Sequence, residues 1–219
     1  MGHIFLSGDN EDIIVGNFIA DSVKGKKYKL YPTEIQKGIL LHRKIDEFTD
    51  KNEHFQNIKL FFIPVYNHYS GVVADLTVDY YLALNWSNYS DIPLKIFTSK
   101  IYNIFLKNYH IIPVRMKRFL HNLIYRDRLL TYSSLKGIKE ALSIMSFHSE
   151  LPDFSAKAVR IIDDNNKEMN NLFNSFINEI REYVQIQKDE ILIDEEKDLN
   201  ANATAQICFD QGSIKRKEV

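Results

Sequence analysis

The amino-acid sequence predicts an all-α protein that folds as a single helical domain. Apolar residues recur at spacings of three and four along nearly the whole chain, which is the period of a helix. Glycine is scarce, at 8 of 219 residues, and no Asn-Gly or Asp-Gly pair marks a β-hairpin. With 45% hydrophobic residues the chain can bury one full core, but it is short for two domains.

Clusters of turn-forming residues divide the chain into helical segments. They fall at 7–10, 24–32, 64–71, 88–93, near Pro113, and at 133–137 and 149–152, so that six or seven helices fit between them. One helix is expected from Thr33, a plausible cap after Pro32, to about Lys51. Another covers 72–86 and is apolar on nearly all sides, as a central helix would be. We expect the domain to span residues 1–189, and 190–219, first acidic and then bland, to form a weakly ordered tail.

Composition excludes several classes of protein. The formal net charge is −1 with no long run of one sign, so we expect no nucleic-acid partner. No apolar run approaches the roughly 20 residues that cross a bilayer, and the N-terminus lacks the features of a signal peptide. We therefore expect a cytoplasmic protein with no membrane partner. A single cysteine, Cys208, cannot form a disulfide within the chain, and the oligomeric state is left open.

The helix predicted at 33–51 carries polar groups on its apolar side. A projection at about 100° per residue places His42 and Asp46 between Ile35 and Ile39, with Asp50 at the edge of this side. A carboxylate that is buried without a partner is costly, so the protein must supply a hydrogen-bond network or a cation. A buried His-Asp pair that only locks the helix is one reading, and a metal site is the other.

The helix at 72–86 makes the same choice, because Asp75 and Asp79 lie on one face among apolar residues. Two carboxylates at this spacing repel each other unless a positive group lies near them. Asp21, one turn after Asn17, and His3 are further candidates, although each could also be an ordinary surface or structural residue. Imidazole with several carboxylates suits Mn²⁺, Mg²⁺ or Fe²⁺, and zinc also fits. The chemistry indicated is metal-assisted hydrolysis, most naturally of a phosphate ester.

Three segments resemble the acyl carrier protein phosphodiesterase family, also called ACP hydrolase. They are G-N-F-I-A-D-S-V-K-G (16–25), G-I-L-L-H-R-K-I-D-E-F-T-D (38–50) and V-V-A-D-L-T-V-D-Y-Y-L-A-L-N-W (72–86), and the resemblance covers roughly 3–185. It implies an all-helical fold related to the HD-domain phosphohydrolases. It also implies cleavage of 4′-phosphopantetheine from the serine of holo acyl carrier protein, dependent on a divalent metal, Mn²⁺ first and Mg²⁺ or Fe²⁺ as alternatives.

The resemblance also assigns roles to residues. Carried over by motif, the metal ligands or catalytic groups are Asp21, His42, Asp46 and Asp79, with His3 as a further ligand and Asn17, Arg43, Asp50 and Asp75 in support. Arg43, Lys24 and Lys27 are predicted to contact the substrate, since a basic cluster at 24–29 would suit an acidic carrier protein. A surface ion pair for Arg43 and a solvated loop for the lysines are the other readings.

Two features depart from the family. The family commonly has His directly after the second Asp of the central helix, where this chain has Tyr80, and only Met1 and Gly2 precede His3. Two other functions therefore stay open. One is a metal-dependent hydrolase acting on another phosphate ester, and the other is a helical binding protein without catalysis.

Overall fold

The computed structural model describes residues 1–188, and every regular element in that part is helical, as predicted. The elements are α1 (Gly2–Leu6), α2 (Glu11–Ile19), η1 (Ala20–Ser22), η2 (Gly25–Leu30), α3 (Thr33–Lys51), α4 (Glu53–Leu60), α5 (Ile63–Tyr66), η3 (Asn67–Tyr69), α6 (Ser70–Leu84), η4 (Trp86–Asn88), α7 (Leu94–Lys107), α8 (Val114–Tyr125), α9 (Arg128–Thr131), α10 (Leu135–His148), α11 (Ser155–Asp164) and a final helix over 166–188.

The helices exceed the six or seven predicted, because short helices occupy several of the predicted breaks. The segment 24–32 contains the 3₁₀ helix η2, and 64–71 contains most of α5 and all of η3. The bounds of α3 agree with the prediction, while α6 begins and ends two residues earlier than expected. The predicted tail, 190–219, lies outside the described residues, and the relation to HD-domain proteins stays a prediction. No helix within 1–188 is both long enough and apolar enough to cross a membrane.

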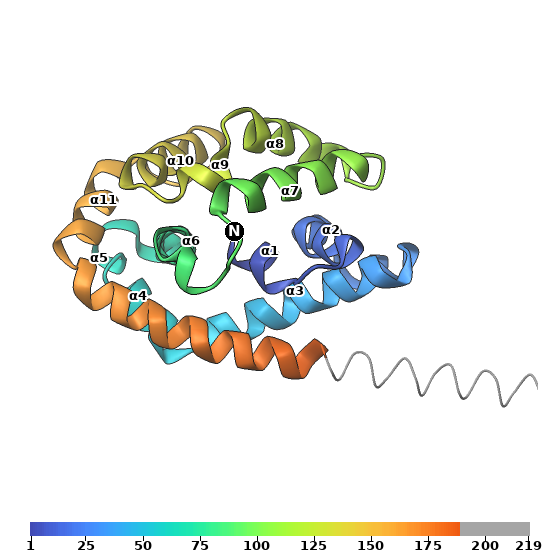
Figure 1. Cartoon of the computed structure of the whole chain (residues 1–219). Coiled ribbons are helices and arrows are strands. Elements are labelled where there is room, and N and C mark those ends of the chain that lie inside the picture. Colours follow the sequence, from blue (N-terminus) through green and yellow to red (C-terminus); the bar gives the residue numbers. More distant parts are fainter. Residues whose placement is uncertain (189–219) are drawn as a thin grey trace, which may run out of the picture.

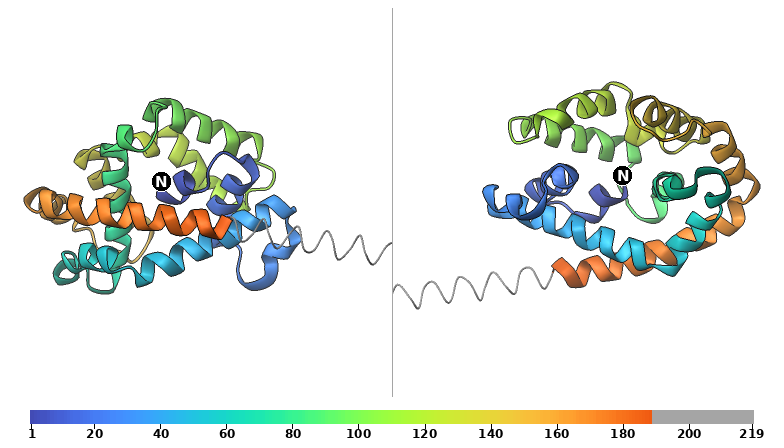
Figure 2. Two further views of the ribbon diagram at one scale, coloured as in Figure 1. Left: turned by 60° about the horizontal axis from the view of Figure 1, so that its bottom comes forward. Right: turned by 180° about the vertical axis from the view of Figure 1, so that it is seen from behind.

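The helices are arranged in three tiers. In Figure 1, and from behind in Figure 2, α7 to α10 lie on one side of the molecule, and α3, α4 and the final helix lie on the other. Between them are α1, α2 and α6. The second half of α3 packs on the final helix, where the rings of Phe48 and Tyr183 stack with their centres 4.6 Å apart. The polar side chains of α3 that face the middle tier thus have α1, α2 and α6 opposite them.

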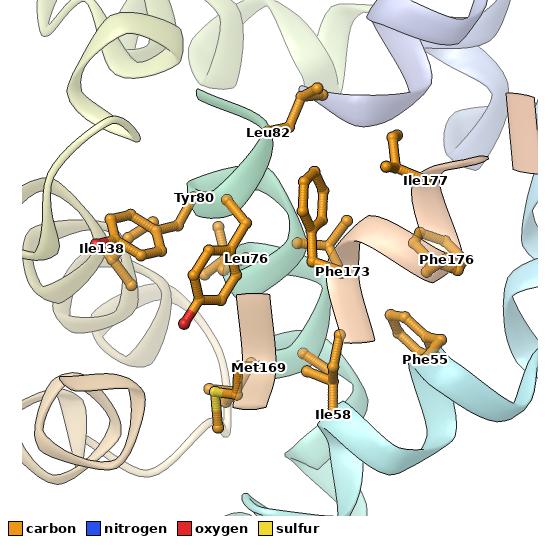
Figure 3. Packing of buried hydrophobic residues seen from close by; sticks show 14 of the residues in the cluster. Phe55, Ile58, Leu76, Tyr80, Leu82, Ile138, Met169, Phe173, Phe176 and Ile177 are labelled. Carbon is orange, nitrogen blue, oxygen red and sulfur yellow. The ribbon is translucent and has the colours of Figure 1, made fainter. Parts of the chain in front are cut away.

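The larger core cluster surrounds α6. Its members come from α6 and from helices on either side, and Figure 3 shows Leu76 and Leu82 of α6 with Phe55 and Ile58 of α4, and Phe173 of the final helix. Residues on nearly every side of α6 are buried, including Val73, Ala74 and Tyr81 at 0% exposure. The prediction of a central helix is therefore confirmed. The few charged residues of α6 therefore need positions where the helix borders a cavity.

Two glycines let α2 and α3 approach each other closely. A Cβ atom added to Gly16 would lie 2.2 Å from the carbonyl oxygen of Ile35, and one added to Gly38 would lie 2.2 Å from that of Ile13. Real Cβ atoms do not come this near to backbone, so both positions require glycine. The contact matters for function because Asn17 follows Gly16, and His42 lies one turn after Gly38.

Candidate metal centre

The centre is built around His42, whose ring is buried on the inner side of α3. Its Nε2 atom lies 3.2 Å from Asp46 Oδ2, one turn further along the helix, and 3.3 Å from Asp21 Oδ1. Asp21 belongs to η1, the 3₁₀ turn that ends α2. Its side chain is 81% exposed, so the reading of a solvent-facing residue and the reading of a site residue both describe it. The structure brings the three predicted residues together at one imidazole nitrogen.

Asn17 holds the other nitrogen of the same ring. Its Oδ1 atom lies 2.8 Å from His42 Nδ1, and its Nδ2 atom donates to the His3 carbonyl oxygen at 3.0 Å and to Ser7 Oγ at 2.9 Å. Because an amide oxygen only accepts, this contact places a proton on Nδ1 and leaves Nε2 for a ligand or a second proton. Partners of this kind orient metal-binding histidines in known sites.

His3 completes a compact set of ligand atoms. Its ring, on α1, stacks on that of His42 with centres 4.3 Å apart, and its Nε2 atom lies 3.3 Å from Asp46 Oδ1. Its Nδ1 atom is buried and has no hydrogen-bond partner among the described residues. One atom each from His3, His42 and Asp46 lie within 4.8 Å of one another, which is close enough for all three to bind one metal ion.

The carboxylates of α6 face this set across a cavity of about 480 Å³. Asp79 accepts hydrogen bonds from the amino group of Met1 and, at 2.8 Å, from the backbone N–H of Gly2. Residues from α3, η1 and α6 line the cavity, and they bring its acidic groups to five: Asp21, Asp46, Asp50, Asp75 and Asp79. All the carboxylates singled out from the sequence therefore border one space.

The pKa shifts of the side chains in the centre indicate that positive charge is favoured there. Burial alone would lower the pKa of His42, yet hydrogen bonds to Asp21 and Asp46 raise it to about 9. The bond to His42 also lowers the pKa of Asp21. Burial, and then the positive charge on His42, lower the pKa of His3 to about 4. For Asp75, burial and then the neighbouring Asp79 and Asp46 raise the pKa to about 7, although its side chain is open to the cavity.

The residues predicted to bind substrate lie outside the cavity lining. Arg43 Nη2 donates to the carbonyl oxygens of Val23 and Gly25, each at 2.9 Å, and its guanidinium lies 5.3 Å from the ring centre of Tyr28. Arg43 thus holds the segment that carries the predicted lysines, whose side chains are exposed. The contact of Arg43, Lys24 and Lys27 with substrate stays a prediction.

Tyr80, where the family commonly has His, belongs to the core. It is 7% exposed and packs in the larger cluster on α6, which also includes Ile138 (Figure 3). Among the described residues that line the cavity of the centre, Asp79 is present and Tyr80 is not. The tyrosine at this position therefore packs in the core and adds no group to the cavity around His42.

Two basic residues near the centre carry no signal in the sequence. Lys59 of α4 lines the cavity, and Arg115 of α8 donates from Nε to Ser22 Oγ at 3.1 Å, beside Asp21. Neither belongs to a motif, and both reach the site from helices that pack there only in the tertiary structure.

Comparison with known proteins shows the family of this chain. The family model described as acyl carrier protein phosphodiesterase matches residues 1–180. The chain belongs to this family. Membership makes it a hydrolase that acts on a phosphodiester, as predicted.

Several relatives carry the same name. The chain is 29% identical over 148 residues to the acyl carrier protein phosphodiesterase of Pectobacterium atrosepticum, a match that covers 67% of this chain and 76% of the relative. It is 28% identical over 150 residues to that of Escherichia coli O6:K15:H31, with the same coverage. It is 32% identical over 95 residues to that of Klebsiella pneumoniae subsp. pneumoniae, covering 43% of this chain and 49% of the relative. No solved structure gave a significant match.

Proposed function

We propose that this protein hydrolyses the phosphodiester that joins 4′-phosphopantetheine to a serine of holo acyl carrier protein, and that it uses a divalent metal ion, Mn²⁺ first. The observation that carries the proposal is the meeting of Asp21 and Asp46 at His42 Nε2 while Asn17 occupies Nδ1. A structural His-Asp pair needs one carboxylate. Two carboxylates at one nitrogen, with a second imidazole stacked on the same ring, are the donors of a metal site.

The residues present fit such an ion. Without it, His42 with its raised pKa holds a proton between two carboxylates, so a cation is already favoured at this point. His3, His42 and Asp46 would hold the ion, with Asp21 beside His42 and Asp79 across the cavity. A bound divalent ion would act as a Lewis acid toward a phosphoryl oxygen and would lower the pKa of a water molecule.

The surrounding side chains have their own tasks in this proposal. Asn17 keeps the His42 ring in one tautomer and one orientation. Asp75 is the carboxylate suited to carry a proton, since it faces the cavity and burial raises its pKa to about 7. A group with this pKa can both accept and release a proton near neutral pH.

The carrier protein would dock beside the centre. Lys24 and Lys27 lie on the exposed segment that follows Asp21, and Arg43 fixes this segment through two carbonyl oxygens. An acidic partner would be attracted by the lysines in a manner that weakens as salt rises. Tyr28 and Tyr31 of this segment pack against buried core residues, so these rings and Arg43 hold it in place together.

The test follows the mass of holo acyl carrier protein incubated with metal-stripped protein, with and without Mn²⁺. We expect loss of the phosphopantetheine mass only with metal, and no loss with Asp46→Asn. Glu47→Gln is the matched control, because Glu47 is an exposed neighbour whose contact is a surface pair with Lys51 at 2.7 Å. It should retain full activity.

Three results would contradict parts of the proposal. Cleavage of the carrier without added metal would refute the proposed requirement for a metal ion. Cleavage of bis(4-nitrophenyl) phosphate with no change in the carrier would favour another phosphate ester as substrate. Neither activity, in a protein that binds no Mn²⁺, would favour a binding protein without catalysis.

A further inference from the structure

A second cavity, of about 500 Å³, lies between α6, α8, α9 and α10. Most of its lining is apolar, with Leu76, Leu123 and Met145 among the side chains that form it. Asp75 and Asp79 line this cavity as well as that of the metal centre. The two cavities therefore adjoin at these carboxylates, and a molecule bound in one cavity can extend past them into the other.

Arg128 gives the second cavity an unusual polar group. The residue is only 6% exposed, and its Nη1 and Nη2 atoms have no hydrogen-bond partner within residues 1–188. A guanidinium is charged at any ordinary pH and offers five N–H donors, so burying it unpaired is costly. Such a cost is understandable where a ligand supplies the acceptor.

The buried arginine is close to the catalytic side of the cavity. Burial raises the pKa of the Tyr132 phenol, Asp79 raises it further, and Arg128 lowers it, so both charges lie near this ring. At the mouth, Phe119 is 54% exposed and Met145 is 37% exposed, which leaves apolar surface open to an entering group. Arg115, also at the mouth, contacts Ser22 beside Asp21.

We infer that the second cavity binds the pantetheine arm of the substrate and that Arg128 donates to one of its amide carbonyl oxygens. The inference rests on the function proposed above. The arm is uncharged beyond its phosphate, carries methyl groups and two amides, and ends in a thiol. It therefore needs apolar walls and a few well-placed donors, which is the usual make-up of a small-molecule site. With the phosphodiester among Asp21, His42 and Asp46, the arm passes Asp79 to reach Arg128.

The test is calorimetric titration of the metal-stripped protein with pantetheine, which has neither phosphate nor carrier protein. We expect the parent to bind and Arg128→Met to bind about tenfold more weakly or worse, since a charged hydrogen bond is lost while an unbranched apolar stem remains. Arg126→Met is the matched control, because Arg126 is exposed two residues away. It should bind as the parent does.

A second variant covers the case in which Arg128→Met does not fold. Met145→Trp enlarges a partly exposed side chain on the cavity wall, so it should also weaken pantetheine binding about tenfold without disturbing the core. Equal binding by the parent and either folded variant would overturn the inference, as would no binding by the parent. The inference would also be overturned if the protein bound hexanoate and not pantetheine, because Arg128 would then pair with a free carboxylate.

This experiment fails independently of the proposed function. Because the titration contains no metal and no phosphodiester, pantetheine can bind while holo carrier protein is left uncut, which would refute only the proposed reaction. Metal-dependent cleavage of the carrier by a parent that does not bind pantetheine would refute only the role of the second cavity.

Discussion

Replacing Asn17 with leucine should weaken both the fold and metal binding. The side chain is 1% exposed and makes three hydrogen bonds, to His42 Nδ1, the His3 carbonyl oxygen and Ser7 Oγ. Leucine has the same branched skeleton of heavy atoms, with bulkier methyl groups, but pairs with none of these groups. At about 1 kcal/mol for each lost bond, the free energy of unfolding should fall by about 3 kcal/mol, and by more if the partners stay dry.

Metal affinity should fall as well, because the His42 ring loses the contact that orients it. Removing such a partner typically lowers metal affinity about 10- to 100-fold, or about 1.4 to 2.7 kcal/mol. Denaturant unfolding of the metal-stripped protein measures the first effect, and calorimetric titration with Mn²⁺ measures the second. Each quantity is thus obtained without an activity assay.

Asn52→Ala is the control for this pair of measurements. Asn52 is also buried, caps α4 through the N–H of Phe55, and donates to Glu179 at 2.6 Å, so its loss should cost about 1 kcal/mol or more. It touches none of the proposed ligands, and its Mn²⁺ affinity should equal that of the parent. If Asn17→Leu loses stability but binds Mn²⁺ as tightly as the parent does, then Asn17 is only a brace and the reasoning about His42 is wrong.

Three further predictions concern pH and packing. In the metal-stripped protein folded Asp75, with a pKa of about 7, keeps a proton that the unfolded chain releases near 3.8, so its own contribution to the free energy of unfolding falls as pH rises from about 4 to 7. His3, with its lowered pKa, acts in the opposite direction, so the measured quantity is the difference between Asp75→Asn and the parent in denaturant unfolding. The stability of Asp75→Asn relative to the parent should rise across this range, and a constant difference would contradict the shift. Mn²⁺ binding at pH 7.5 should release a proton from His42, whose pKa is about 9, and calorimetry in two buffers of different ionisation enthalpy measures it. Gly38→Ala should cost about 3 kcal/mol or more, since the new Cβ meets the Ile13 carbonyl oxygen, whereas Gly71→Ala, with nothing within 4 Å, should not destabilise in the same unfolding assay.

Helical periodicity was sufficient to find the heart of the site. The pattern of apolar residues in 33–51 is local information, and α3 has the predicted bounds with His42 and Asp46 on its inner side. The same reasoning identified Asp75 and Asp79, because a charged residue on an otherwise apolar helix is visible in the sequence itself. Because buried carboxylates need a shared cation or hydrogen-bond partners, it was expected that those of the two helices would border one cavity.

Periodicity could not identify the residues whose place in the site depends on contacts with other helices. Asp21 is mostly exposed and yet bonded to His42, a combination that no single-helix pattern predicts. The bond between Asn17 and His42 exists because Gly16 and Gly38 bring α2 and α3 into backbone contact, and this approach joins residues far apart in the chain. Arg128 had no motif at all, since its burial arises from the way α9 packs between α7 and α10.

The distribution of charge connects the metal centre to the substrate. Five carboxylates line the first cavity, against Lys59, protonated His42 and the amino group of Met1, so a phosphodiester anion would be repelled from it. The attractive groups lie outside, on the segment with Lys24 and Lys27 and on α8 with Arg115. We infer that the basic rim brings the carrier to the opening, and that only a divalent ion among the carboxylates makes the interior able to hold its phosphate.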